Sequence, residues 1–463
     1  MQNETSSVYK HSSFKGLIGV ASLDITPPIG IYFRNWGLSK SDVAEGIHRP
    51  MMLSCLTFQS TSGGQPLILI SADLGWWRTS EDENEMRTQV LEALSIEASQ
   101  LMICLSHTHA GPSICRSDAH RPGGQFIGPY LESLKSKSIA AAQEALSNAS
   151  SATLTWHYGK CDLATNRDLR DQQNDRNIVG FNPDVLADDT LLVGRVCDEA
   201  QRIIASIVNY ACHPTTLAWD NPLVSPDFIG SMRETIENHT HAPCLFLQGA
   251  SGDLAPQEQY SGDTELADKH GRQLGFAALS TLAGMLPPET MLDYQGVQES
   301  GAPLAIWNRT SSPSQTVLSA ELMEVPLVLK PLLPSIGDLQ EAWNACDDPV
   351  LKERLWRKLC IRRSIGDGNI SKMPLWIWRL GDALLIGQPN EAYSDFQQDL
   401  RKQLSPTAVG VMNIVNGSFG YLPPSELYDK NAYAVWQSPF AAGSLESLTD
   451  VAVKAAQRIM RGE

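Results

Sequence analysis

The amino-acid sequence predicts an α/β fold with a largely buried sheet. Over its first two-thirds, the 463-residue chain alternates short, β-branched apolar runs with amphipathic stretches. A strand followed by a helix, repeated, is typical of a sheet covered by helices. The composition, 42% hydrophobic and 19% charged, is that of a globular protein, and there is no low-complexity tract or heptad array.

Eight apolar segments in this first part are predicted to be strands. Each is short and is closed by polar or turn residues. They span residues 16–28, 51–58, 66–73, 101–106, 153–159, 191–197, 203–212 and 243–249.

Helices are expected between several of these strands. Ser80 and Glu83 have the spacing of a capping box, ahead of apolar residues that recur on one helical face. Residues 130–146 and 266–285 also have helical periodicity.

From about residue 300 the pattern changes. A long strand is expected over 317–330, a charged helical stretch over 337–363, strands over 373–380, 383–388 and 408–416, and a last helix over 445–460. No internal repeat or flexible linker separates the two parts. We therefore expect a flexible N-terminus, residues 1–15, followed by one domain, residues 16–463.

The net charge of −16 argues against a protein that coats nucleic acid or an anionic membrane. The first 16 residues lack the apolar core of a signal peptide, and no stretch approaches ~20 apolar residues, so we expect a cytoplasmic protein without integral membrane association. Nine cysteines, an odd number without C-x-x-C spacing, are expected to be reduced core residues.

The sequence His107-Thr108-His109 directly follows the predicted strand 101–106. In an extended segment, residues two apart project to the same side, so both imidazoles can face one metal ion. The alternative is one structural and one exposed histidine. His213 follows strand 203–212 in the same way, and ligands in open α/β sheets gather at the carboxyl ends of strands.

Glu391 and Tyr421 also follow apolar strands, each after a short loop containing Gly or Pro. Glu391 could equally be a favourable charge in the first turn of a helix, and tyrosine is an unusual zinc ligand. Residues 246–257 form a Gly-rich turn that lacks nucleotide-binding spacing, so a tight turn close to the site is the better interpretation.

Taken together, these motifs resemble the neutral ceramidase family of zinc amidases. The matching segments run in order along nearly the whole chain: GVASLDITPP, SADLG, SHTHAGP, Asn166-Arg167, NYACHPT, SPDFIGSMRETIE, FLQGASGDLAP, IGQPNEAY and GYLPPSELYDKNAYA. The resemblance implies mixed central sheets flanked by helices, with a zinc site at the carboxyl ends of strands.

The resemblance also implies roles for individual residues. One zinc ion per chain would be held by His107, His213, Glu391 and Tyr421. His109 would lie beside the metal, Arg167 near the scissile group, and Tyr433 would be a second active-site tyrosine.

Three departures from the family matter for the substrate. Ala255 stands where ceramidases have a serine, the glutamate loop is QPNE rather than PGE-like, and we expect no C-terminal immunoglobulin-like domain. The sequence therefore favours hydrolysis of an amide bond in a small polar N-acyl compound over ceramide. The alternatives are an esterase, a carbohydrate-active hydrolase or lyase, and an inactive zinc-binding relative.

Overall fold

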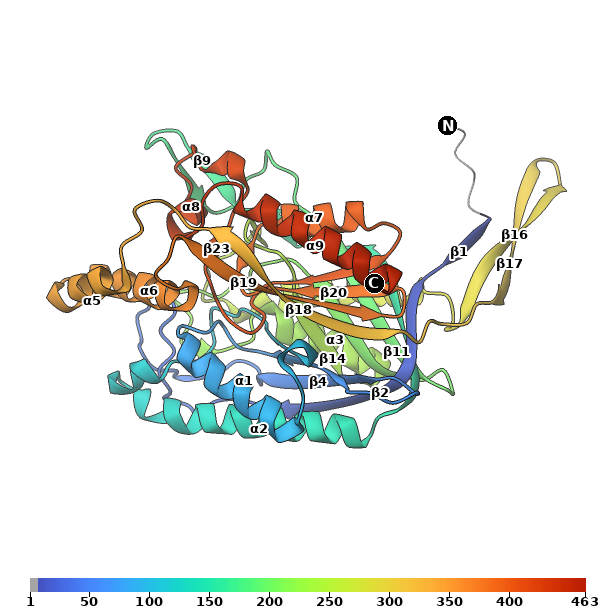
Figure 1. The fold of residues 1–463 in the computed structure, drawn as a ribbon, viewed down its shortest axis with the longest axis horizontal. Coiled ribbons are helices and arrows are strands. Elements are labelled where there is room, and N and C mark those ends of the chain that lie inside the picture. The colour runs from blue at the N-terminus through green and yellow to red at the C-terminus, as the bar shows by residue number, and fades with distance from the viewer. Residues whose placement is uncertain (1–6) are drawn as a thin grey trace.

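The computed structural model describes residues 7–463 and contains two mixed β-sheets between layers of helices (Figure 1). The larger sheet has eight strands in the order β14-β12-β11-β7-β2-β4-β5-β6. Neighbouring strands are antiparallel except for the β12–β14 and β5–β6 pairs. Its strands are β2 (Ser12–Asp24), β4 (Met52–Gln59), β5 (Leu67–Ala72), β6 (Leu101–Leu105), β7 (Ser150–Lys160), β11 (Thr190–Asp198), β12 (Ile203–Tyr210) and β14 (Cys244–Gln248).

A four-stranded sheet packs against one face of the larger sheet. Its order is β18-β19-β20-β22, with bounds Leu318–Val328, Ile370–Leu380, Ala383–Gly387 and Ala408–Met412. Successive side chains along β11 point to opposite faces of the larger sheet. Leu192 belongs to the core that also contains Trp376 and Trp378 of the smaller sheet, whereas Leu191 and Val193 face the helices.

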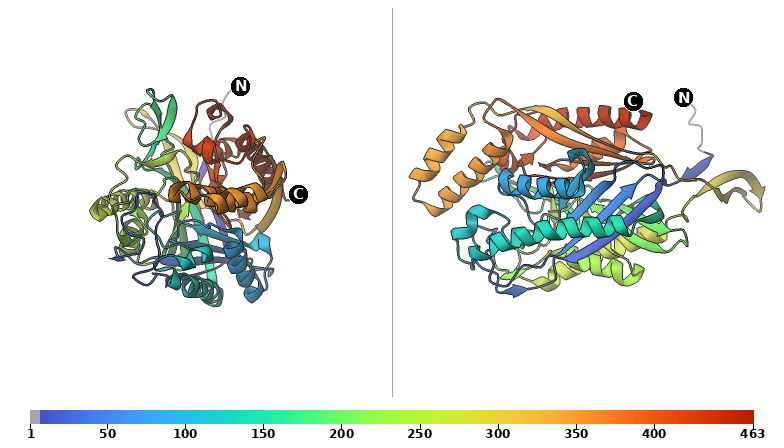
Figure 2. Two further views of the ribbon diagram at one scale, coloured as in Figure 1. Left: turned by 90° about the vertical axis from the view of Figure 1, so that its left-hand side faces the viewer. Right: turned by 60° about the horizontal axis from the view of Figure 1, so that its bottom comes forward.

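Helices cover the two outer faces, giving four layers. Helices α1 (Ser80–Leu94), α2 (Ile127–Ser147), α3 (Phe228–Thr240) and α4 (Thr264–Ala283) cover the larger sheet, and α2 lies across its strands in the right-hand view of Figure 2. Helices α7 (Ser394–Gln403) and α9 (Ser444–Arg461) cover the smaller sheet.

Two features project from opposite ends of this body (Figure 1). One end carries α5 (Ile336–Ala345) and α6 (Pro349–Ile365), and the other carries the sheet formed by β1 (Val8–Lys10), β16 (Thr290–Glu299) and β17 (Pro303–Ser311). The remaining elements are short. They are β3 (Gly46–Ile47), β8 (Ala164–Asn166), β9 (Asp168–Asp171), β10 (Arg176–Val179), β13 (Leu223–Val224), β15 (Leu254–Pro256), β21 (Glu391–Ala392), β23 (Tyr421–Leu422), α8 (Tyr433–Gln437) and the 3₁₀ turns Ala98–Gln100, Arg116–His120, Gly124–Phe126 and Ser425–Leu427.

The larger sheet is so strongly curled that its two edges meet. β14 at one edge contacts β4, β5 and β6 at the other. Ser71 Oγ of β5 donates a hydrogen bond to the carbonyl oxygen of Phe246 in β14, at 2.6 Å. The buried Asp73, just after β5, pairs through both carboxylate oxygens with Arg233 of α3, at 2.7 and 2.8 Å. This ion pair joins the β5 edge to the helix beside β14.

The α/β fold and the mixed sheets agree with the sequence prediction, but several local predictions were wrong. Thr79, not Ser80, caps α1, and its side chain accepts from the Asp82 amide. The predicted helix 337–363 is interrupted, because Asp348 starts a new helix by accepting from the Leu351 amide at 2.7 Å. The β16–β17 hairpin was not predicted.

The predicted boundary at residue 16 falls inside β2, because β1 and the start of β2 already lie between residues 8 and 15; residues 1–6 lie outside the described part. All nine cysteines are free, as expected, and only Cys346 is not fully buried. No helix in residues 7–463 is both long and apolar enough to cross a membrane.

We predict that Asp73→Asn lowers the free energy of unfolding by about 3–5 kcal/mol, because Arg233 is left buried without its counter-charge. Urea unfolding monitored by circular dichroism measures the loss. A matched control is Glu324→Gln, which removes a carboxylate from the exposed Lys372–Glu324 pair and is expected to change stability little. Parental stability in Asp73→Asn would mean that this pair does not hold the sheet edges together.

Candidate metal centre

His107 lies in a sharp turn just after β6. Its amide donates to the Leu74 carbonyl, and its backbone has φ +66°, in the left-handed region that a histidine adopts only under constraint. The segment is therefore not the extended continuation of the strand that the sequence suggested. The imidazoles of His107 and His109 nevertheless come together, with ring centroids 4.9 Å apart.

His213 follows β12, at the far end of the strand order from β6. Its amide donates to the Leu254 carbonyl, and the curl of the sheet brings its imidazole to His107, with Nε2 atoms 3.2 Å apart. Two predicted strand ends therefore meet at one point, as expected from their sequence positions.

Glu391 and Tyr421 lie side by side because they are register partners in the parallel β21–β23 pair. Glu391 Oε2 is 3.0 Å from Nε2 of His213 and 3.4 Å from Nε2 of His107. The Tyr421 ring stacks on the His213 ring, with centroids 6.4 Å apart and planes at 8°. All four residues predicted as metal ligands are therefore gathered in one place.

The donor and acceptor pattern fits a cation. Nδ1 of His213 is 2.6 Å from the Ser251 carbonyl oxygen and Nδ1 of His107 is 3.4 Å from the Gly75 carbonyl oxygen. A carbonyl only accepts, so each Nδ1 donates its proton to the backbone, and each Nε2 is the atom left to bind a metal ion. Two lone pairs and a carboxylate oxygen thus converge on one buried point, where a divalent cation would satisfy all three.

The protonation states also suit a metal ion. Burial and the charge of Arg167 lower the pKa of His213 to about 3. Burial raises the pKa of Tyr421 well above that of a free phenol. A ring neutral at Nε2 and an ionised carboxylate are the states that bind metal.

His109 is the third member of a histidine group that could hold an ion together with His107 and His213, since their nitrogen atoms lie within 4.8 Å of one another. Its Nε2 is buried and has no hydrogen-bond partner. Burial, with His107 and His213 nearby, lowers the pKa of His109 well below its usual value. Its ring is therefore neutral and free to bind a ligand or exchange a proton.

Arg167 is buried beside the ligands and does not line the cavity in front of them. One of its terminal amino groups donates to the Tyr421 hydroxyl and to the Gly252 carbonyl, both at 2.9 Å, and lies 3.3 Å from Nε2 of His213. The residue predicted to lie near the scissile group thus contacts two predicted metal ligands directly.

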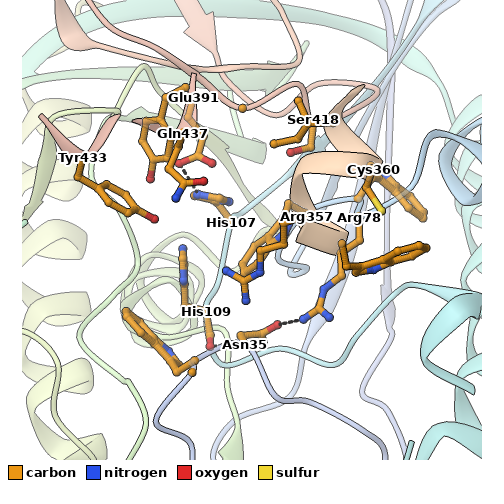
Figure 3. A pocket seen from close by; sticks show the side chains of 18 residues that line it. Asn35, Arg78, His107, His109, Arg357, Cys360, Glu391, Ser418, Tyr433 and Gln437 are labelled. Carbon is orange, nitrogen blue, oxygen red and sulfur yellow. Dashed lines mark hydrogen bonds and ion pairs between the residues drawn. The ribbon is translucent and has the colours of Figure 1, made fainter. Parts of the chain in front are cut away.

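A cavity of about 220 Å³ opens in front of the histidines. Figure 3 shows Glu391, His107, His109 and the hydroxyl of Tyr433 around it. Burial raises the pKa of Tyr433, so its hydroxyl remains protonated and can donate a hydrogen bond.

Sequence reasoning missed most of the walls of this cavity. The rings of Trp36 and Trp76 lie 5.3 and 4.9 Å from the His109 ring, and Asn35, Arg78, Arg357 and Gln437 also line the space. Trp76 could have been found, since it directly follows the SADLG motif at the end of strand β5. The other residues lie in loops and helices, and no pattern in the neighbouring sequence indicates that they face the cavity.

Two aspartates that come after β5 and β14, near the histidines, bind other groups. Asp73 pairs with Arg233, and Asp253 accepts from the amide and hydroxyl of Ser394 at 2.7 and 2.8 Å. Backbone carbonyls orient the imidazoles instead. Ala255 is fully buried in β15 and does not line the cavity.

Comparison with known proteins places the fold. No protein-family model matches the chain, and no curated protein sequence matches it. A crystal structure of neutral ceramidase from Pseudomonas aeruginosa is similar with a TM-score of 0.71 and 15% identity, over 97% of this chain and 75% of that one. A structure described as ceramidase complexed with C2 gives 0.70 and 14%, over 97% and 76%. The chain therefore has the neutral ceramidase fold.

We predict that Tyr421→Phe makes zinc affinity depend less steeply on pH between pH 5 and 6.5 than it does in the parent protein. The phenol of Tyr421 must lose a proton to bind as phenolate, and burial keeps its pKa high. His213, with a pKa of about 3, has no proton to release in this window. Zinc dissociation constants, measured by chelator competition at several pH values, give the slope of log affinity against pH for the parent and for Tyr421→Phe.

Two variants serve as controls for this titration. His213→Ala should lose zinc binding, whereas His239→Ala, which removes an exposed imidazole from α3, should bind like the parent. An unchanged slope in Tyr421→Phe would mean that Tyr421 does not bind zinc as a phenolate.

Proposed function

We propose that this protein is a zinc-dependent hydrolase that cleaves the amide bond of an N-acyl compound, with one zinc ion held by His107, His213, Glu391 and Tyr421. The observation that supports this most is the convergence of two imidazole lone pairs and a carboxylate at the base of a cavity. The ceramidase fold adds an expectation of amide chemistry.

A zinc ion bound there would lower the pKa of a water molecule toward ~7 and polarise the substrate carbonyl. His109 suits proton transfer, because its Nε2 is free and the residue lines the cavity. It would accept the proton of the attacking water and deliver it to the leaving nitrogen. No covalent intermediate is needed, which agrees with alanine at position 255.

Two residues would stabilise the oxyanion that forms on the attacked carbonyl. The Tyr433 hydroxyl faces the cavity and would donate to it directly. Arg167 would act from behind Tyr421, where a buried positive charge offsets developing negative charge. Its planar fork also fixes the position of Tyr421 against the Gly252 carbonyl.

We propose a small polar substrate rather than a long-chain lipid, because polar side chains stand among the tryptophans that line this cavity. Its walls include Asn35, Arg78 and Gln437 as well as tryptophans. Asn35 donates to the Gly111 carbonyl at 2.8 Å and accepts from Arg78 at 3.1 Å, so a rigid polar surface borders the histidines.

The test is a substrate panel on the zinc-loaded protein. We expect small N-acyl compounds to yield a free carboxylate and a free amine, and chelation to abolish turnover. Long-chain ceramide should be a poor substrate, and Ala255→Ser should not improve it. Cleavage of esters alone, or an unsaturated product absorbing in the ultraviolet, would favour an esterase or a lyase. No turnover of any class, with zinc bound, would indicate an inactive relative.

We predict that Arg167→Ala folds but turns over substrate more slowly and binds zinc more weakly than the parent, because the arginine fixes Tyr421 and places a positive charge beside His213. kcat/KM, zinc content and melting temperature measured together separate catalysis from folding. Lys should restore only part of the rate, because it lacks the fork that contacts both Tyr421 and Gly252. A zinc-loaded alanine variant with the parental rate would exclude a catalytic role.

A further inference from the structure

A second, larger cavity of about 680 Å³ adjoins the one at the metal centre. Five residues line both spaces: Trp36, Gly37, Arg357, Tyr433 and Gln437. A substrate anchored at the histidines can therefore extend into the outer cavity, and the groups on its wall would meet the part of the substrate remote from the scissile bond.

The wall of the outer cavity is cationic, although the chain as a whole carries a net charge of −16. It contains two acidic side chains, Asp42 and Glu353, and five basic ones, Arg34, Arg121, Arg354, Arg357 and Lys358. Both acids are already paired: Asp42 with Arg34 at 2.6 Å and Glu353 with Nε of Arg357 at 3.1 Å. The concave surface therefore has an excess of positive charge, which attracts anions.

Arg357 is the residue best placed to use this charge. It lies on α6, and Figure 3 shows its side chain reaching from that helix into the inner cavity. Glu353 holds its Nε, but no hydrogen bond or ion pair joins its two terminal amino groups to another residue of the described chain. Arg78, the other arginine of the inner cavity, is by contrast already bound to Asp118, Asn35 and the Arg34 carbonyl.

We propose that the substrate is an anionic N-acyl compound that bears a carboxylate away from the scissile amide, and that Arg357 binds this carboxylate. The inference rests on the proposed amide hydrolysis and specifies its substrate class. Two free amino groups on a planar guanidinium match the two oxygens of a carboxylate. Arg121, Arg354 and Lys358 add attraction at the entrance without fixing the orientation.

The carboxylate can belong to either half of the compound, so two matched substrate pairs are compared. N-acetylphenylalanine against N-acetylphenethylamine places it on the amine, and N-succinylphenethylamine against N-butanoylphenethylamine places it on the acyl group. For one pair, we expect kcat/KM of the anionic member to exceed that of the neutral member by about 10- to 100-fold, the range for hydrogen bonds to a charged group.

Arg357→Gln should reduce this ratio toward one, and Arg357→Lys should keep part of it, since lysine retains the charge without the fork. Arg202→Gln is the matched control, because Arg202 also pairs with an acid four residues before it but does not line either cavity. Zinc content and melting temperature identify any variant that has not folded. Hydrolysis of both pairs without preference for the anion would overturn the inference and leave the proposed function standing.

A binding measurement tests the carboxylate site without turnover. Titration calorimetry of zinc-loaded protein with 3-phenylpropanoate should show binding that is at least tenfold weaker in Arg357→Gln, with no such change for the neutral 3-phenylpropanamide. That result together with no amide hydrolysis would refute the proposed function and keep the anion site. Equal affinity in Arg357→Gln and the parent would mean that the carboxylate binds elsewhere, and the inference would be wrong.

Discussion

The structure depends on the meeting of three hydrogen-bond acceptors at one buried point. Nε2 of His107, Nε2 of His213 and Oε2 of Glu391 lie within 3.4 Å of one another, and backbone carbonyls hold the Nδ1 protons of both rings on the opposite side. Such a group of acceptors is unfavourable by itself, because it places buried lone pairs beside a buried carboxylate, even though an amino group of Arg167 approaches Nε2 of His213. The surrounding fold must hold them rigidly together.

The curl of the larger sheet supplies this rigidity. His107 and His213 follow strands that are far apart in the strand order, so a flat sheet would separate them widely. Contact between β14 and β4, β5 and β6 closes that distance, and the Asp73–Arg233 pair joins the end of β5 to α3, the helix that packs against β14. The smaller sheet packs against the curled sheet. The short strands β21 and β23, which come after β20 and β22 in the chain, place Glu391 and Tyr421 side by side.

The two ceramidase structures share this fold at only 15% and 14% sequence identity. The layers need only apolar side chains at alternating strand positions, which many sequences provide. The walls of the two cavities come from loops and from α6, outside the sheets. Residues such as Trp36 and Arg357 can therefore change without disturbing the curled sheet.

The sequence by itself determined most strands of the larger sheet and the histidines that follow two of them. The spacing of apolar residues located β5, β6, β12 and β14, because the period of a strand depends on residues that are close in the sequence. His107 and His213 were identified as the histidines that follow β6 and β12. Glu391, Tyr421, His109, Arg167 and Tyr433 required resemblance to a family, since a lone residue after a strand has several local explanations. Only the tertiary structure decided that His107 and His213 meet, that Arg167 lies behind Tyr421, and that Arg357 of a distant helix enters the cavity. These contacts join residues more than a hundred positions apart, and they follow from how curled layers pack, which no local pattern records.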